Sequence, residues 1–178
     1  MTSSLRQKVQ PGRFQKKLKT KKILITGSRD ASPQMIKKAE KIARWCMKKG
    51  YYIICGDAPG IDTTVVKTTS RGKYERITVC GAKGYQKVMT PYGENWFTIG
   101  SYPERDAVMA YVCDMCIGIW NGRSTGTRIT FTDAKNYGRP TVVFDYKKKE
   151  VTTHRVVEGR LVARETKRLS SARSVRVS

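Results

Sequence analysis

Glycine-rich turns occur at four points of the sequence, and two of them also carry arginine and serine. They read Gly27-Ser-Arg-Asp30, Gly56-Asp-Ala-Pro-Gly-Ile-Asp62, Gly81-Ala-Lys-Gly84 and Asn121-Gly-Arg-Ser-Thr-Gly-Thr127. A glycine lets the backbone approach a ligand with exposed N–H groups, and the start of a following helix attracts negative charge. Arg29, Arg123 and Arg128 could add charge-assisted hydrogen bonds. One such turn is weak evidence, because any tight strand–helix turn needs glycine, but several together indicate a ligand that carries phosphate.

Short apolar runs alternate with amphipathic segments between these turns. The run 23–26 is β-type and nearly all apolar, which is typical of a strand buried on both faces. From Ser32-Pro33 onward, apolar residues recur at helical spacing until Gly50. We expect strands over 23–26, 51–55, 76–80, 115–120 and 141–146, and helices over 33–49, 61–70, 103–114 and 127–137.

The alternation of strands and helices predicts the α/β class. We expect a Rossmann-like, doubly wound and mainly parallel sheet of about five or more strands, with basic N- and C-terminal extensions. Ligands bind such sheets outside the carboxyl ends of the strands, where the four turns lie. Residues 82–103 are irregular and predict a long loop. Its aromatic residues and lysines are candidates for stacking a base, for covering the sheet edge or for a dimer contact.

Positive charge is concentrated at the two ends of the chain. The sequence has 36 Lys+Arg against 14 Asp+Glu, a net charge of +22, and residues 1–22 contain eight basic residues and no acid. We divide the chain into a basic arm (1–21), a Rossmann-like domain (22–146) and a basic extension (147–178). In that extension, residues 151–163 predict a short hairpin around Glu158-Gly159, and a second basic tail begins at Lys167.

This excess of positive charge points to an acidic partner, which we expect to be DNA, RNA or a nucleoprotein complex. Two other interpretations of the arm remain open: a solubilising tail, and a mitochondrial targeting peptide, against which Pro11-Gly12 argues. The residues expected to contact nucleic acid are Arg6, Lys8, Arg13, Lys16, Lys17, Lys19, Lys21, Lys22, Arg164, Lys167 and Arg168.

Several function classes are disfavoured by what the sequence lacks. No apolar run is long enough for a membrane span or a secretion signal, so we expect a cytoplasmic protein of a bacterium or a phage-infected cell, with no membrane partner. Neither a Walker loop nor a G-x-G-x-x-G after the first strand occurs. Cys113 and Cys116 form the sole C-x-x-C, and a structural zinc would need two more ligands at matched spacing, so we expect no metal. The single histidine, His154, argues against a Ser-His-Asp triad.

Four motifs in this order resemble the SLOG superfamily of Rossmann-like domains. The motifs are Ile23-Leu-Ile-Thr-Gly-Ser-Arg29, Gly56-Asp-Ala-Pro-Gly-Ile-Asp62, Arg105-Asp106 and Ile119-Trp-Asn-Gly-Arg-Ser-Thr-Gly-Thr127. The resemblance covers about residues 22–146 and is closest to the small stand-alone bacterial and phage members. The superfamily also includes the DNA-processing protein A fold and the phosphoribohydrolases first called lysine decarboxylase-like proteins.

The resemblance implies a pocket for a nucleotide or nucleotide derivative between the first and the last of the glycine-rich turns. Arg105 would sit over this pocket, and Asp62 would either face the ligand or cap the helix that it begins. Self-association is common in the superfamily, which makes a homodimer a candidate assembly. The residues that the resemblance implies for ligand or phosphate binding are Gly27, Ser28, Arg29, Gly56, Gly60, Asp62, Arg105, Gly122, Arg123, Ser124, Gly126 and Thr127.

One departure from the superfamily bears on catalysis. The hydrolase branch has a glutamate three residues after its Gly-Thr pair, and this sequence has Thr130 there. Cleavage of an N-glycosidic bond needs a carboxylate, which threonine cannot supply; Asp57, Asp62 or Asp106 could substitute, but nothing in the sequence assigns them that role. The sequence therefore favours a nucleotide-binding protein with basic arms over two alternatives: a phosphoribohydrolase-like enzyme, and a nucleic-acid-packaging protein with a vestigial pocket.

Overall fold

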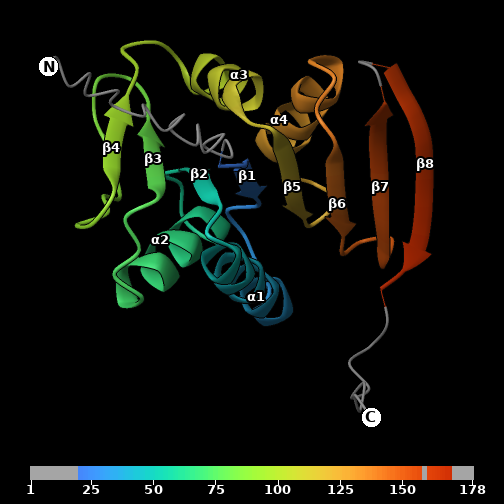
Figure 1. Ribbon diagram of the computed structural model, residues 1–178, viewed down its shortest axis with the longest axis horizontal. Coiled ribbons are helices and arrows are strands. Elements are labelled where there is room, and N and C mark those ends of the chain that lie inside the picture. Colours follow the sequence, from blue (N-terminus) through green and yellow to red (C-terminus); the bar gives the residue numbers. More distant parts are fainter. Residues whose placement is uncertain (1–19, 158–159, 170–178) are drawn as a thin grey trace, which may run out of the picture.

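The computed structural model describes residues 20–157 and 160–169. Within them lie four helices and one sheet of eight strands, in the order β4-β3-β2-β1-β5-β6-β7-β8 (Figure 1). The strands are β1 Lys22–Gly27, β2 Tyr52–Gly56, β3 Ile77–Gly81, β4 Glu94–Phe97, β5 Met115–Trp120, β6 Thr141–Asp145, β7 Glu150–Val157 and β8 Arg160–Arg168. The helices are α1 Pro33–Lys49, α2 Ile61–Arg71, α3 Tyr102–Val112 and α4 Thr125–Asn136.

The sheet is parallel from β4 to β6, and β7 and β8 add two antiparallel strands at one edge. This architecture confirms the predicted Rossmann-like, mainly parallel α/β fold. From β1, the strand order runs through β2 to β4 on one side and from β5 to β8 on the other. The order thus reverses between β1 and β5, and the crevice outside their carboxyl ends is where such sheets bind ligands.

Local sequence signals explain where the helices begin and end. The Ser32 hydroxyl caps α1 by accepting a hydrogen bond from the Met35 N–H, and Gly50 ends that helix at φ 68°. Ser101 and Glu104 form the predicted capping box at the start of α3. The predicted helices are all present, with bounds that differ by one or two residues.

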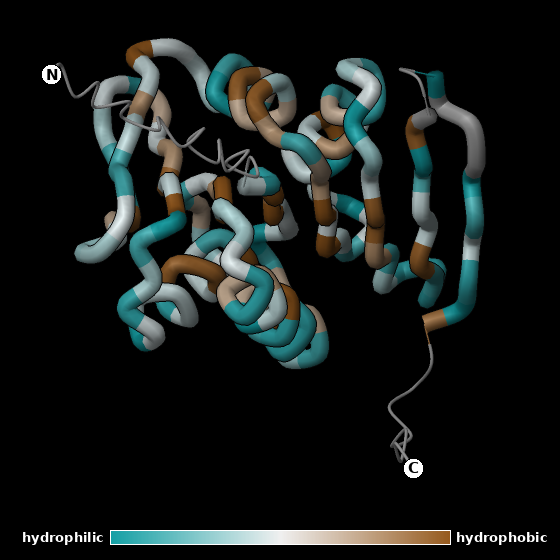
Figure 2. The backbone as a smooth tube through the Cα atoms, viewed as in Figure 1, coloured by the Kyte–Doolittle hydropathy of each residue, from teal (hydrophilic) through white to brown (hydrophobic). Residues whose placement is uncertain are grey.

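Helices cover both faces of the central sheet, with α1 and α2 on one side and α3 and α4 on the other (Figure 1). A hydrophobic core lies on each face of the sheet, and alternate residues of β1 contribute to each. Ile23 and Ile25 pack against α1 and α2, whereas Leu24 packs against α3 and α4. Figure 2 shows hydrophobic residues along the central strands and hydrophilic ones on the outer helix surfaces. The central strands are therefore buried on both sides, as their apolar composition predicts.

Two edges of the sheet differ from the sequence-based expectation. Residues 82–103, expected to be a loop, contain the strand β4, which pairs with β3. The sequence did not predict this strand because all four of its residues are exposed and form no apolar run. Where we expected a short hairpin over residues 151–163, β7 and β8 pair antiparallel, and they extend the main sheet through pairing of β6 with β7. Lys167 and Arg168, expected in a tail, lie in β8.

Most of the expected arm, residues 1–19, lies outside the described residues. No helix of the described part is long and apolar enough to cross a membrane.

Candidate functional site

A polar pocket of about 280 Å³ opens at the carboxyl end of β1, where the strand order reverses. It is bounded by the turns after β1 and β2, by α3 and by the start of α4. The residues that line it are Thr26, Gly27, Arg29, Ala58, Asp62, Arg105, Asp106, Met109, Ser124, Thr125, Gly126, Thr127 and Thr130.

The first turn of α4 forms one wall of the pocket. The Asn121 side-chain oxygen accepts hydrogen bonds of 2.9 Å from the N–H groups of Arg123 and Ser124, which fixes the approach to the helix. Ser124 caps α4, and its hydroxyl also lies 2.9 Å from that of Thr127. The N–H groups of Thr125 and Gly126 have no acceptor within the described part of the chain. They are free to bind an anion, which the helix dipole favours at this end.

Gly126 leaves room beside these N–H groups. A Cβ atom built there meets no atom within 4 Å, and its backbone is ordinary helix. A Cβ atom at this lining residue would therefore meet open space.

The turn after β1 is fixed by contacts with the neighbouring turns. The Ser28 N–H donates to the carbonyl of Ile119 (3.1 Å), and the Ser28 hydroxyl accepts from the Asn121 N–H (3.0 Å). Gly60 adopts φ +82°, and a Cβ there would lie 2.3 Å from the Arg29 carbonyl oxygen, so only glycine allows this approach. Ser28 and Gly60 thus hold the turn that presents Arg29 to the pocket.

A buried charge cluster forms the floor of the pocket around Arg105, of which 4% is exposed. Its Nη1 donates to Asp57 Oδ1 at 3.0 Å and to the Cys80 carbonyl at 2.7 Å, and its Nε donates to Asp106 Oδ1 at 2.7 Å. A Cβ on Gly56 would lie 2.8 Å from Arg105 Nη1, so this glycine makes space for the guanidinium. Arg105 is therefore a lining residue of the pocket that is held in place by buried carboxylates.

Asp62 has one oxygen without a partner. Its Oδ2 accepts a hydrogen bond from the Ala58 N–H at 3.2 Å, whereas Oδ1 is buried with no hydrogen-bond partner within the described residues. Burial raises the pKa of Asp62 to about 7, against the opposing effect of the Arg105 charge. Burial also raises the pKa of Asp106. An unpartnered buried oxygen is costly, so this floor suits a ligand that donates a hydrogen bond.

A basic and aromatic rim lies beside the pocket, centred on Tyr102. The Arg29 guanidinium lies 5.7 Å from the Tyr102 ring centre, and the amines of Lys83 and Lys87 lie 5.4 Å and 4.4 Å from it. A hydrogen bond with Lys87 lowers the pKa of Tyr102. This rim adds positive charge beside Arg29, the pocket residue that would meet an anion.

The structure brings together seven of the twelve residues predicted to bind the ligand, and these are Gly27, Arg29, Asp62, Arg105, Ser124, Gly126 and Thr127. The other five do not line the pocket, and they are Ser28, Gly56, Gly60, Gly122 and Arg123. Instead, Ser28 and Gly60 hold the turn after β1, and Gly56 leaves space for the Arg105 guanidinium. Asp106 lines the floor but was not among the predicted site residues, although it follows Arg105 directly in one of the four motifs. Thr130 also lines the pocket, and its hydroxyl donates to the Gly126 carbonyl at 2.9 Å.

The residues predicted to contact nucleic acid lie away from the pocket lining where the structure describes them. Lys21 and Lys22 are at the start of β1, and Arg164, Lys167 and Arg168 lie along β8. Six others fall outside the described residues, namely Arg6, Lys8, Arg13, Lys16, Lys17 and Lys19. All five cysteines are free and buried, as expected for core residues. The described part contains no cluster of three or more side chains suited to a metal ion.

Fold and pocket together define a Rossmann-like domain with a polar crevice at the point where the strand order reverses. The chain belongs to the DNA recombination-mediator protein A family, whose model matches residues 11–99. That match includes the turns after β1, β2 and β3, and it ends before Arg105 and α4. No curated protein matches the sequence.

Solved structures share the fold at low sequence identity. DNA processing protein A from Helicobacter pylori, described for its single-stranded DNA binding mode, is 19% identical, with a TM-score of 0.55 over 69% of this chain and 64% of that chain. DNA processing protein A from Streptococcus pneumoniae is 22% identical, with a TM-score of 0.58 over 70% and 50% of the two chains. The molybdenum cofactor binding protein from Rippkaea orientalis is 15% identical, with a TM-score of 0.58 over 71% and 77%. This chain thus matches less than two thirds of either DNA processing protein.

Proposed function

We propose that the pocket binds a nucleotide or nucleotide derivative, and that the protein uses this site while associated with nucleic acid. One observation carries the proposal: N–H groups at the start of α4 and a carboxylate oxygen of Asp62 line the same pocket, and neither has a hydrogen-bond partner among the described residues. The first group binds an anion, and the second requires a hydrogen-bond donor.

The phosphate would bind at the start of α4. The N–H groups of Thr125 and Gly126 supply hydrogen bonds and the positive end of the helix dipole, and Arg29 lines the same pocket with a guanidinium. Because Gly126 leaves open space, a phosphate group can approach this backbone closely.

A sugar hydroxyl would bind at the floor. Asp62 Oδ1 has no donor within the part of the chain that the structure describes, and Asp106 lines the same pocket, so a ribose hydroxyl there would supply the missing hydrogen bond. A volume of about 280 Å³ is close to the lower end of the roughly 300–1,000 Å³ range of ligand pockets, which favours one nucleotide unit over a dinucleotide.

Association with nucleic acid is supported by charge and by family. The net charge is +22, and the fold is that of a DNA processing protein described for its single-stranded DNA binding mode. Removal of residues 1–21 tests the contribution of the basic arm. The dependence of DNA affinity on salt should become shallower in the shortened chain, because phosphate contacts release counterions. An unchanged salt slope would show that the arm makes no phosphate contacts.

Hydrolysis of an N-glycosidic bond is a second candidate, and the raised pKa of Asp62 is the observation in its favour. A carboxyl group that titrates near neutral pH is suited to donate a proton to a leaving base. The test is release of free base from nucleoside monophosphates, compared between the native chain and Asp62→Asn. No release of base above the uncatalysed rate by either protein would contradict hydrolysis of these compounds.

The binding proposal is tested by thermal unfolding with a panel of nucleoside monophosphates, diphosphates and nucleotide sugars. A ligand at about 100 times its Kd should stabilise the native chain by about 2.7 kcal/mol. Gly126→Leu should lose this stabilisation, because the new side chain would fill the space beside the N–H groups. Gln34→Leu is the matched control, since Gln34 is the second residue of α1 and is exposed outside the pocket. Equal stabilisation of both variants would place the ligand elsewhere.

A further inference from the structure

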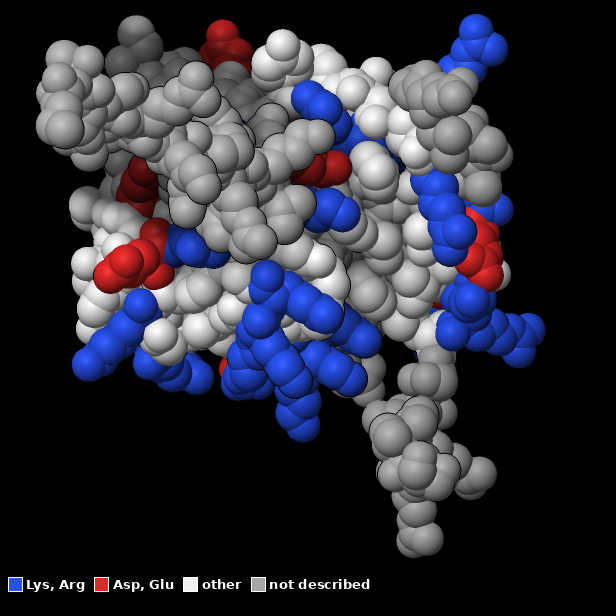
Figure 3. All heavy atoms as spheres, in the orientation of Figure 1, with Lys and Arg blue, Asp and Glu red and all other residues white. Residues whose placement is uncertain are grey.

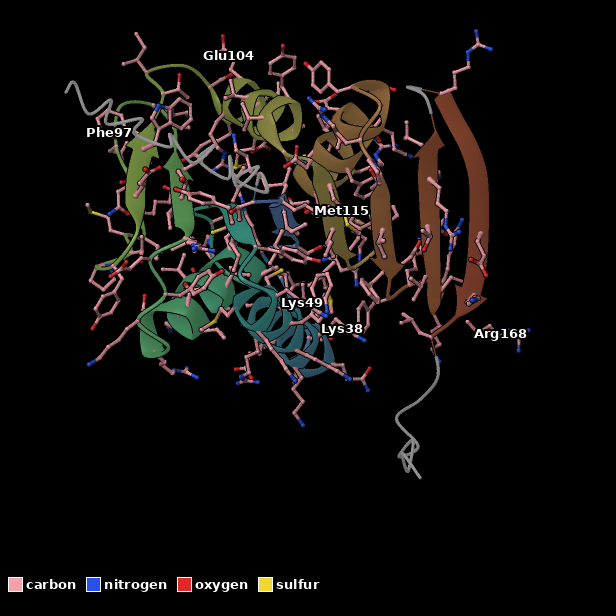
Figure 4. The ribbon with its side chains drawn as sticks, in the orientation of Figure 1. Lys38, Lys49, Phe97, Glu104, Met115 and Arg168 are labelled. Atoms are coloured by element: carbon pink, nitrogen blue, oxygen red, sulfur yellow. The ribbon has the colours of Figure 1, made fainter. Side chains whose placement is uncertain are left out.

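The outer surface of α1 carries a dense group of cations that the pocket does not use. The group, here called the α1 basic face, consists of Lys37, Lys41, Arg44, Lys48 and Lys49 with Trp45 among them. All six residues are exposed, and none of them lines the pocket. Figure 3 shows Lys and Arg side chains gathered over α1, and Figure 4 shows Lys38 and Lys49 on this helix.

The spacing of these residues places their charges in one stripe. Lys37, Lys41, Arg44 and Lys48 follow one another at intervals of three or four residues, so they occupy neighbouring turns of the same face. Arg76 is a further exposed cation at the C-terminal end of α1, where its Nη1 donates to the carbonyl of Gly50, the residue that caps the helix.

Stability of the helix does not account for this stripe. Like charges three or four residues apart destabilise a helix, and Glu40 is the only acid in α1, paired with Arg44 at 3.0 Å. Lys48 and Lys49 suit the negative end of the helix dipole, but Lys37 lies near the positive end, where the first turn has no acid. Burial and the neighbouring Lys41 charge lower the pKa of Lys38, which is consistent with this mutual repulsion.

Trp45 gives the α1 basic face a second property. Its side chain is 40% exposed and packs edge-on against the Tyr51 ring, with ring centres 5.3 Å apart. Exposed aromatic rings between cations are the means by which proteins hold single-stranded nucleic acids, since bases stack on the ring while phosphates meet the cations.

We propose that the α1 basic face binds single-stranded nucleic acid, with Lys41, Arg44 and Lys48 contacting phosphates and Trp45 stacking on an unpaired base. This surface adds a folded contact to the nucleic-acid half of the proposed function. Its failure would leave the pocket proposal untouched, because the two share no residue.

The test uses the full chain with single-stranded DNA and RNA oligonucleotides at several salt concentrations. The triple variant Lys41→Gln/Arg44→Gln/Lys48→Gln should lose about tenfold in affinity, and its log–log salt slope should fall by about 2. The control Lys147→Gln/Lys148→Gln/Arg155→Gln removes the same charges from exposed positions between β6 and β7 and on β7. Equal losses in the two triple variants would overturn the proposal, because net charge alone would then explain them.

Trp45→Leu separates stacking from charge. It should lower affinity for single strands about fivefold or more and leave duplex binding unchanged. Anionic phospholipid vesicles provide the remaining comparison, with the triple variant expected to bind them no worse than its control. A loss on vesicles that exceeds the loss on oligonucleotides would overturn the assignment to nucleic acid.

Discussion

The pocket and the α1 basic face differ in the burial and pairing of their charged side chains. In the pocket, Arg105 is buried, is hydrogen-bonded to Asp57 and Asp106, and lies beside an Asp62 carboxyl whose pKa is about 7. On α1, the cations are exposed, and Glu40 is the only acid of the helix. The pocket therefore depends on fixed geometry, whereas the helix face depends on the amount of charge that it presents.

This difference separates two kinds of recognition. Buried charges interact strongly and are screened little by salt, so the pocket can distinguish one ligand from another by where it places donors and acceptors. Exposed lysines are screened and mobile, so the α1 basic face should bind many sequences with similar affinity. Substitutions in the pocket should change stability and ligand selectivity, and those on α1 should change salt dependence.

Arg105→Met should have the largest effect on stability. It would leave Asp57 and Asp106 in the floor without their cation, and loss of one partner of a buried ion pair costs about 3–5 kcal/mol. Urea unfolding at neutral pH measures the loss, with Arg29→Met as the control at an exposed arginine of the same pocket. A cost below about 1 kcal/mol would mean that Arg105 does not hold the floor together.

Asp62→Asn should change how stability depends on pH. The folded pKa of about 7 lies above the ordinary aspartate value of 3.8, so this carboxyl contributes stability below pH 4 that is lost as the pH rises through 7. The asparagine variant lacks this loss. Its free energy of unfolding, relative to the native chain, should therefore rise between pH 4 and pH 8, by about 1.4 kcal/mol per unit of pKa shift. Parallel pH profiles for the two proteins would contradict the raised pKa.

Arg29→Ala should separate the two sites by function. Loss of a charged hydrogen bond to the ligand phosphate should weaken nucleotide affinity about tenfold or more, measured by titration calorimetry. Oligonucleotide affinity should change little, because Arg29 lies outside the α1 basic face. The triple variant of that face should give the reverse pattern, and equal effects of both changes on both ligands would show that the sites are one.

Ser124→Ala should have the smallest effect. Removal of this helix cap should cost about 1 kcal/mol of stability, measured by thermal unfolding. It should also weaken nucleotide binding, because the Thr125 and Gly126 N–H groups lose their fixed orientation. Ser32→Ala, at the cap of α1, should cost similar stability with no change in nucleotide affinity.

The fold was predictable because apolar runs and glycine-rich turns mark β1, β2, β3, β5 and β6 directly. The strand β4 was not predictable, since an exposed edge strand shows neither an apolar run nor a regular alternation. The positions of Gly27, Arg29, Ser124 and Gly126 beside the pocket followed from their turns. The hydrogen-bond partners of Arg105 could not be predicted, because these contacts join residues that lie 25 or 48 positions apart in the chain and leave no local sequence pattern.

The α1 basic face shows a different limit. Its lysines can be seen in the sequence, but the apolar spacing of residues 35–47 marks the helix only as a core element. Which cations share a stripe, and that Trp45 stands exposed among them, follows from the helix orientation against the sheet.

Mass spectrometry of small molecules released from the purified native chain, Gly126→Leu and Gln34→Leu shows whether the pocket holds a nucleotide. We predict that the native chain and Gln34→Leu release the same phosphate-bearing nucleotide or nucleotide derivative, and that Gly126→Leu releases none. Equal amounts of that compound from all three proteins would contradict a binding site at the start of α4.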